Sequence, residues 1–182
     1  MPAPEIGTVM ADKTIYAGLS PQTGRMLFVL PEDESRLMDY QSALDGAGIN
    51  NRTCHLGHSD WRLPTLSELH VIFINRRKGA LRDTFNEEAA NYPDLGLSHR
   101  EAAGWYRTDY WSSYNSKQSQ SFKDGTTAPI FDTDSASVRF IREGGFPDAV
   151  ELAPHVMPDI TATRQKRLKA LASATRARIK FS

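Results

Sequence analysis

The first thirty residues have the pattern of a β-hairpin. Apolar and β-branched residues dominate 14–19 and 25–30, and the Ser20-Pro21-Gln22-Thr23-Gly24 segment between them has the composition of a turn. This pattern predicts two strands that pair across the turn.

Two short helices are predicted next. The first starts after a candidate N-cap at Asp39 and is expected to end near Gly46 and Gly48, and its apolar positions at helical spacing are Leu37, Tyr40, Ala43 and Leu44. The second starts with a capping box, in which Thr65 and Glu68 each satisfy a backbone N–H of the first turn. It is expected to end near residue 75, and its apolar face consists of Leu66, Leu69, Ile72 and Phe73.

A polar segment separates these helices from a group of short strands. Residues 76–104 are mixed in charge and are interrupted by glycines and a proline, which predicts a partly irregular insertion. Short strands with a turn at Asp124-Gly125 follow, and they are expected at 110–113, 119–123, 128–131 and 137–142. In the last of these strands, Val138 and Phe140 are expected to share a face. This combination of elements predicts an α+β domain.

The composition is that of a globular protein. Hydrophobic residues make up 40% of the chain and charged residues 24%. No apolar run reaches the roughly 18–20 residues that a membrane-spanning helix needs. The N-terminus lacks the basic and apolar regions of a signal peptide, so none is expected. Cys54 is the single cysteine and cannot form an internal disulfide, so stability is expected to come from burial.

The formal net charge of zero hides an uneven distribution of charge. The chain of 182 residues has 22 Lys and Arg and 22 Asp and Glu, but every acidic residue lies at or before Asp159. Residues 1–159 therefore carry a formal charge of −7, and residues 160–182 carry +7. The division predicts a domain, a linker and a basic segment, which correspond to residues 1–143, 144–158 and 159–182.

Four separated motifs resemble a known family. They are Asp60-Trp61-Arg62-Leu63-Pro64-Thr65 followed by Glu68-Leu69, then Tyr110-Trp111-Ser112-Ser113, then Phe122 with Asp124-Gly125, and finally Val138-Arg139-Phe140-Ile141-Arg142. In this order and spacing they resemble the Lcl C-terminal-domain-like family, a bacterial and phage family of unknown function with a C-type-lectin-like fold. The segment from Gly7 to Gly18 is similar to the leader of phage-associated relatives, so the resemblance covers roughly residues 7–143. Phe140 stands where the family pattern has a cysteine.

The resemblance implies a C-type-lectin-like fold, with two short helices, a small twisted antiparallel sheet and long loops. Simple physical roles account for the motif residues. Trp61 and Leu63 suit burial beside the second helix, Pro64 presets the turn before it, and Arg62 suits pairing with an internal carboxylate or with backbone carbonyls. We therefore expect scaffold roles, rather than ligand contacts, for Trp61, Arg62, Pro64, Trp111 and Arg139.

The resemblance also implies the place of a binding surface. In this fold the last strands and their loops often present variable side chains, and related folds serve as receptor-binding proteins of phages and as adhesins. The corresponding stretch combines tyrosine with amides, a lysine and carboxylates, which suits adaptable polar recognition, although an ordinary wet surface is the alternative for each residue. The candidate ligand-binding residues are Tyr114, Asn115, Lys117, Gln118, Gln120, Asp132 and Asp134.

Metal-ligand patterns are weak. Cys54, His55 and His58 form a Cys-His-x-x-His sequence, but no second Cys or His pair completes a tetrahedral zinc site, and His70 lies on the following helix. A solvated loop is therefore the favoured interpretation of this segment. Aspartates in the last loops have the chemistry for a hard cation, but such residues usually cap turns, and the candidates are Asp109, Asp132 and Asp134.

Catalytic motifs are weaker still. The chain has no P-loop, no dinucleotide-binding glycine motif and none of the common hydrolase signatures. The C-type-lectin-like fold also includes formylglycine-generating enzymes and calcium-dependent lectins. The chain lacks the paired cysteines of these enzymes and the acidic and amide motifs of these lectins. We therefore expect no enzymatic activity, no cofactor and no bound metal.

The C-terminal segment has the pattern of a basic amphipathic helix. After Asp159 there is no acid, and apolar or small residues recur at helical spacing from Leu168 to Ile179. The favoured interpretation is docking on an acidic surface of the same or a neighbouring chain, and the alternatives are solvated disorder, nucleic acid and an anionic membrane surface. The partner-docking candidates are Arg164, Lys166, Arg167, Leu168, Leu171 and Ile179.

These observations predict a non-enzymatic binding module, a phage or prophage virion component of a tail fibre or tail tip that recognises a host-surface glycan or protein. Repeated copies in a homo-oligomer would strengthen a weak single site. The alternative is a structural or assembly subunit whose tail docks on neighbouring chains. Both hypotheses imply virion proteins or further copies of the chain as partners, without nucleic acid or membrane insertion, and a location in the virion and in the cytoplasm of the producing bacterium.

Overall fold

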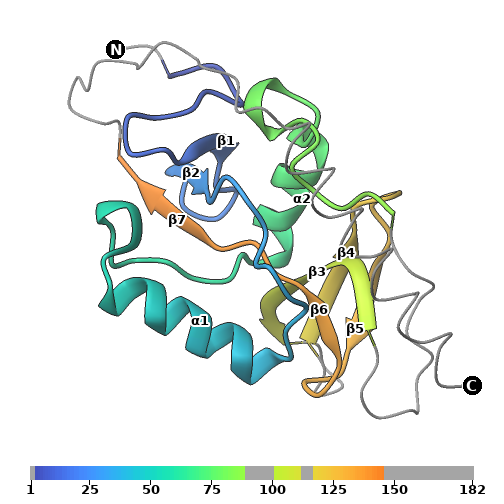
Figure 1. The fold of residues 1–182 in the computed structure, drawn as a ribbon. Helices are drawn as coiled ribbons and strands as arrows, with labels where there is room; N and C mark the ends of the chain where they lie inside the picture. Colours follow the sequence, from blue (N-terminus) through green and yellow to red (C-terminus); the bar gives the residue numbers. More distant parts are fainter. Residues whose placement is uncertain (1–2, 89–100, 112–116, 146–182) are drawn as a thin grey trace, which may run out of the picture.

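The computed structural model describes residues 3–88, 101–111 and 117–145. Within these ranges the chain has two α-helices, two single-turn 3-10 helices and seven strands in two sheets (Figure 1). The α+β class predicted from the sequence is therefore confirmed. The helices are Tyr40–Arg52 (α1), His55–Gly57 (η1), Leu66–Asn75 (α2) and Gly79–Leu81 (η2).

The first sheet joins the two ends of the described body. Its strands are β1 (Ile15–Leu19), β2 (Met26–Val29) and β7 (Ile141–Gly144), in the order β1-β2-β7, and all neighbours are antiparallel. The predicted hairpin is confirmed, because β1 and β2 are joined by the turn at residues 20–24. Strand β7 is paired with β2 and so closes the body against its first hairpin.

The second sheet lies on the other side of helix α2. Strands β3 (Glu101–Trp111), β4 (Lys117–Ser121), β5 (Thr127–Ile130) and β6 (Ser135–Ser137) have the order β5-β4-β3-β6, and β6 is parallel to β3. Strand β3 begins nine residues before the strand predicted at 110–113, so the end of the predicted insertion is wrong. Residues 112–113 of that predicted strand lie outside the described residues.

The turn between β4 and β5 needs a glycine for two reasons. Gly125 has a φ of 84°, which places it in the left-handed region that side chains disfavour. A Cβ atom at this position would lie 2.6 Å from the ring of Phe73 on α2. The Asp124-Gly125 turn that the sequence predicts is thus confirmed, and it seats the β4–β5 hairpin directly on α2.

Helix α2 is the central element of the body. It contacts β1 of the first sheet and β3 and β4 of the second (Figure 1). Its predicted capping box is present, since Thr65 Oγ1 accepts from the Glu68 N–H at 3.3 Å and Glu68 Oε2 accepts from the Thr65 N–H at 2.9 Å. The main core forms around the buried face of α2, and its buried members are Ile15, Ala17, Leu27, Val29, Leu69, Ile72, Leu81, Phe85, Tyr106, Phe122 and Ile141.

Helix α1 starts where the sequence predicts and ends later. Asp39 caps it, because its Oδ1 accepts from the Ser42 N–H at 2.7 Å. The end predicted near Gly46 and Gly48 is wrong, because the helix continues to residue 52. A Cβ at Gly46 would lie 3.0 Å from the ring of Phe140, so this glycine allows close packing and does not terminate the helix.

A second core lies under α1. Its buried members are Leu30, Met38, Ala43, Ala47, Trp61, Leu63, Val138 and Phe140. The strand predicted at 137–142 is wrong, because β6 ends at Ser137 and β7 begins at Ile141 in the other sheet. The residues between these strands pass from one sheet to the other, and the carbonyls of Val138 and Phe140 accept from backbone N–H groups of the segment after β2. Val138 and Phe140 lie in one core, but they do not share the face of a strand, because neither belongs to a strand.

The linker predicted at 144–158 and the basic segment at 159–182 lie almost entirely outside the described residues and stay predictions. The same is true of the docking candidates on that segment. Within the part of the chain that the structure describes, no helix is long and apolar enough to cross a lipid bilayer.

Candidate functional site

The Trp61-to-Thr65 motif forms a buried ionic cluster at the start of α2. Arg62 donates to both carboxylate oxygens of Glu68, from Nη1 and Nη2, at 2.8 Å each. Nη2 also donates to Glu143 Oε1 on β7 at 3.0 Å, and Ser20 Oγ donates to Glu68 Oε1 at 2.9 Å. The cluster therefore joins the β1–β2 turn, α2 and β7. The expected pairing of Arg62 with an internal carboxylate is confirmed.

The carboxyl group of Glu68 stays ionised although it is fully buried. Burial alone would raise its pKa, but hydrogen bonds from Arg62, the Thr65 N–H and Ser20, together with the charge of Arg62, outweigh burial and lower the pKa from 4.5 to about 2. Trp61 lies beside this cluster with only 2% of its surface exposed, and its indole N–H donates to the His55 carbonyl at 3.0 Å. These motif residues hold the scaffold together.

A second buried cluster is centred on Arg139. Its guanidinium donates to Asp33 Oδ1 at 2.7 Å, to the Leu30 carbonyl at 2.8 Å and to the Thr84 carbonyl at 2.7 Å. The Tyr106 hydroxyl donates to the other oxygen of Asp33. Burial and the Asp33 carboxylate raise the pKa of Tyr106 well above its usual value of 10, so the hydroxyl stays protonated.

Three of the candidate ligand-binding residues are buried. Lys117 is fully buried with its ammonium group 3.9 Å from the centre of the Tyr40 ring, and Gln120 and Asp134 are 1% and 2% exposed. Their side chains are therefore not part of the open surface that the sequence analysis assigned to them. Gln118 is half-buried and Asp132 is exposed. Tyr114 and Asn115 lie outside the described residues, as does the side chain of Asp109.

Asp134 helps to hold the loop before β6. Its Oδ2 accepts from the Phe131 N–H at 3.2 Å, and its carbonyl accepts from the buried guanidinium of Arg107. Burial lowers the pKa of Arg107 to about 10, although the charges of Asp132 and Asp134 oppose this effect. The two aspartates are therefore neighbours of a buried cation. Among the described residues no group of three or more His, Cys, Asp or Glu side chains has the arrangement of a metal site.

The Cys-His-x-x-His segment forms an exposed loop around η1. Cys54 is exposed and free, and His55 is exposed. His58 turns away from them, and its Nε2 lies 2.7 Å from Asp12 Oδ2. Burial would raise the pKa of Asp12, but hydrogen bonds from Thr14 and the contact with His58 outweigh it and lower the pKa. These contacts agree with the solvated loop favoured from the sequence.

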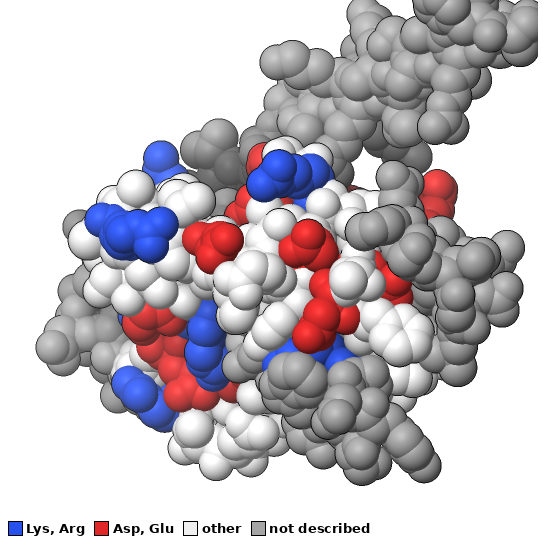
Figure 2. Space-filling view, turned by 90° about the horizontal axis from the view of Figure 1, so that it is seen from below, with Lys and Arg blue, Asp and Glu red and all other residues white. Residues whose placement is uncertain are grey.

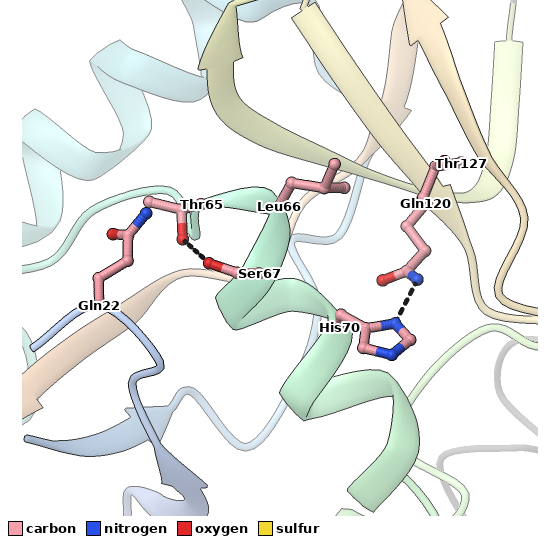
Figure 3. A pocket seen from close by; sticks show the side chains of 7 residues that line it. All are labelled: Gln22, Thr65, Leu66, Ser67, His70, Gln120 and Thr127. Carbon is pink, nitrogen blue, oxygen red and sulfur yellow. Dashed lines mark hydrogen bonds between the residues drawn. The ribbon is translucent and has the colours of Figure 1, made fainter. Parts of the chain in front are cut away.

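A hollow of about 430 Å³ opens between the N-terminal turn of α2, the β1–β2 turn and the β4–β5 hairpin (Figure 3). Most of its surface is apolar, and polar groups interrupt that surface at a few points. Gln22 lines it from the β1–β2 turn, and Gln120 and Thr127 line it from β4 and β5. Helix α2 supplies Thr65, Leu66, Ser67 and His70. Among the described residues that line it there is no Asp, Glu, Lys or Arg, so these residues bring no charged side chain to the hollow.

Gln120 and His70 form the polar centre of this hollow. Gln120 Nε2 donates to the Gly125 carbonyl and to His70 Nδ1, at 3.0 Å each. An amide NH₂ only donates, so His70 Nδ1 accepts, and the neutral ring carries its proton on Nε2. Gln120 Oε1 is buried and has no hydrogen-bond partner among the described residues. In Figure 3 this oxygen points to the side of Leu66 and α2.

Of the residues that line this hollow, only Gln120 is among the ligand-binding candidates predicted from the sequence. His70 and Gln120 are fifty residues apart in the chain, and no local pattern connects them. One signal was present in the sequence, because the capping box at Thr65 places the start of a helix, and with it Ser67, at the surface. The comparisons add no relative: neither a scan against protein-family models nor a search of curated proteins finds a match for this chain.

Proposed function

We propose that this chain is a binding module with a C-type-lectin-like fold, a component of a phage or prophage tail that recognises a glycan or protein on the host surface. The observation that carries the proposal is the open hollow lined by hydroxyl, amide and imidazole groups from three elements. Such groups on a rigid support suit the recognition of polar ligands. The clusters around Arg62 and Arg139 join the elements of that support.

Two features of the fold support the C-type-lectin-like assignment. The described body has two α-helices and mainly antiparallel strand pairing, in line with the resemblance to the Lcl C-terminal-domain-like family, although its strands form two sheets with one parallel pair where the resemblance implies one antiparallel sheet. The motif residues Trp61, Arg62 and Arg139 are part of the scaffold. Function in this assignment therefore depends on the surface that the scaffold carries.

Binding to host cells tests this function. We expect the full chain, labelled with a fluorophore and displayed in many copies on a bead, to bind intact cells of some bacterial strains and to be displaced by soluble surface glycan from those strains. Display in many copies is needed because a shallow single site binds weakly. Beads that carry the Thr127→Trp variant, which fills the hollow, serve as the control. If cells of every strain retain beads with the unmodified chain and beads with the Thr127→Trp variant equally, the proposal is contradicted.

The division of charge favours a second candidate function, that of an assembly subunit. Residues 160–182 carry +7 against −7 for the rest of the chain. On the face shown in Figure 2, acidic groups lie among basic ones over much of the described surface and do not form one separate patch. A basic segment that docks there would contact several small acidic groups on its own or a neighbouring chain.

Removal of residues 155–182 tests this assembly role. We expect the truncated chain to form a smaller assembly than the full chain, because the segment that carries the complementary charge is gone. Light scattering after gel filtration measures the mass at low salt and again at high salt, where screening weakens such contacts. A matched full-length variant replaces Arg164, Lys166 and Arg167 by Gln. An unchanged mass for both variants would contradict docking by this segment.

A further inference from the structure

Two residues that line the hollow beside α2, Gln120 and His70, carry an unused acceptor and an unused donor. The acceptor is Gln120 Oε1, which is buried and has no partner among the described residues. Its orientation is fixed, because Nε2 of the same amide donates to both Gly125 and His70. The donor is the Nε2–H of the exposed His70 ring, for which the described residues provide no acceptor. An unsatisfied buried acceptor costs free energy unless a ligand or water binds to it.

We infer that this hollow is a subsite for an uncharged saccharide, and that one sugar hydroxyl donates to Gln120 Oε1 while another group of the sugar accepts from His70. This inference rests on the proposed binding function and specifies its ligand. A hydroxyl both donates and accepts, so a sugar satisfies the amide oxygen and the imidazole N–H together. A carboxylate has no proton to give to Gln120, and an ammonium group accepts nothing from His70.

The rest of the hollow suits the same ligand. Most of its surface is apolar, and Leu66 lies between the N-terminal turn of α2 and Gln120 (Figure 3). A pyranose ring has apolar C–H faces and polar edges, so it covers such a surface while its hydroxyls reach the polar groups at the edge. Ser67 and Thr127 provide hydroxyls, and Gln22 provides an amide, at that edge. The described residues that line the site include no charged side chain, so they offer no counter-ion to an acidic sugar.

The first turn of α2 adds further donors. Leu66 and Ser67 are the first two residues of a ten-residue helix, and the N–H groups at these positions have no acceptor within a helix. Glu68 and Thr65 are already engaged in the capping box.

Nuclear magnetic resonance of the full-length chain tests the subsite. Methyl glycosides of a neutral hexose, an N-acetylhexosamine and a hexuronic acid are titrated, and the side-chain signals of Gln120 and His70 are followed. We expect saturable shifts with a neutral glycoside in the millimolar range and none with the hexuronic acid. Preferential binding of the hexuronic acid, or neutral glycosides that leave both signals unchanged, would overturn the inference.

Two surface variants and a matched control keep this test independent of folding. His70→Ala removes the donor and is expected to weaken binding about fivefold, the usual effect of one lost hydrogen bond. Thr127→Trp fills the hollow and is expected to abolish binding. His55→Ala removes another exposed histidine outside the hollow and is expected to change nothing. Equal affinities for His70→Ala and His55→Ala would overturn the assignment of His70.

The same experiments separate this inference from the proposed function. If the displayed chain binds cells and Thr127→Trp abolishes that binding, but no neutral glycoside shifts the Gln120 signal, the saccharide subsite is refuted while the proposed binding function of the hollow stands with another ligand. If a neutral glycoside binds in the hollow and His70→Ala weakens that binding, the subsite is supported. This holds even if the displayed chain binds no bacterial cells.

Discussion

Arg139→Ala is expected to lower the free energy of unfolding by about 4 kcal/mol, because loss of one partner from a buried ion pair leaves an uncompensated charge. The Arg139 side chain is fully buried and contacts Asp33, Thr84 and the Leu30 carbonyl. Its guanidinium also lies 4.1 Å from the centre of the Phe85 ring. In the variant, the Asp33 carboxylate still accepts the hydrogen bond from the Tyr106 hydroxyl but loses its ion pair with the guanidinium. The carbonyls of Leu30 and Thr84 lose their hydrogen-bond donor.

Urea unfolding followed by tryptophan fluorescence measures this change. Arg142→Ala is the matched control, since Arg142 pairs with Asp60, whose side chain is 51% exposed. Surface pairs of this kind contribute about 1 kcal/mol or less. Arg139→Lys keeps the charge and loses the planar donor set, so its effect is expected to lie between the two. Equal losses for Arg139→Ala and Arg142→Ala would contradict the role assigned to the buried cluster.

Local patterns in the sequence were sufficient for the hairpin, the start of both helices and the capping box. Each of these depends on residues within one turn or one strand, and their spacing is visible in the chain. The end of α1 was not visible, because Gly46 is required by Phe140, which is 94 positions later. The segment 137–142 alternates like one strand, but its two ends pair with different sheets.

The candidate site was harder to predict than the fold. Polar residues such as Lys117 and Gln120 were expected at the surface, since most lysines and glutamines are exposed. Here Lys117 lies over an aromatic ring, and Gln120 is held by a backbone carbonyl and a histidine from another element. Burial of these side chains depends on long-range contacts, so the resemblance and the polar composition of the stretch predicted the wrong environment for them. The capping box could have directed attention to the hollow, because it fixes where α2 begins.

The largest expected pH effect comes from Glu68. Its pKa is lowered from 4.5 to about 2 in the folded chain, so its ionisation stabilises the fold above about pH 4.5, and this contribution is lost as the pH falls toward 2. The shift corresponds to about 2 kcal/mol once it is reduced for the solvent that reaches Arg62, whose side chain is 38% exposed. We therefore expect protonation of Glu68 alone to lower the free energy of unfolding by about 2 kcal/mol between about pH 4.5 and pH 2.

Glu68→Gln isolates this contribution. At neutral pH the variant is expected to be less stable by about 3 kcal/mol, because the amide keeps the shape of the buried side chain but presents an NH₂ group to the guanidinium of Arg62. The difference from the unmodified chain is expected to shrink as the pH falls from 4.5 to 2, since protonation of Glu68 breaks the same ion pair. Glu87→Gln is the control, because Glu87 pairs with Arg77, which is 68% exposed. Urea unfolding curves at several pH values measure the stability of both variants. If the free energy of unfolding of Glu68→Gln stays lower than that of the unmodified chain by the same amount down to pH 2, the charge of Glu68 is not what joins the β1–β2 turn, α2 and β7.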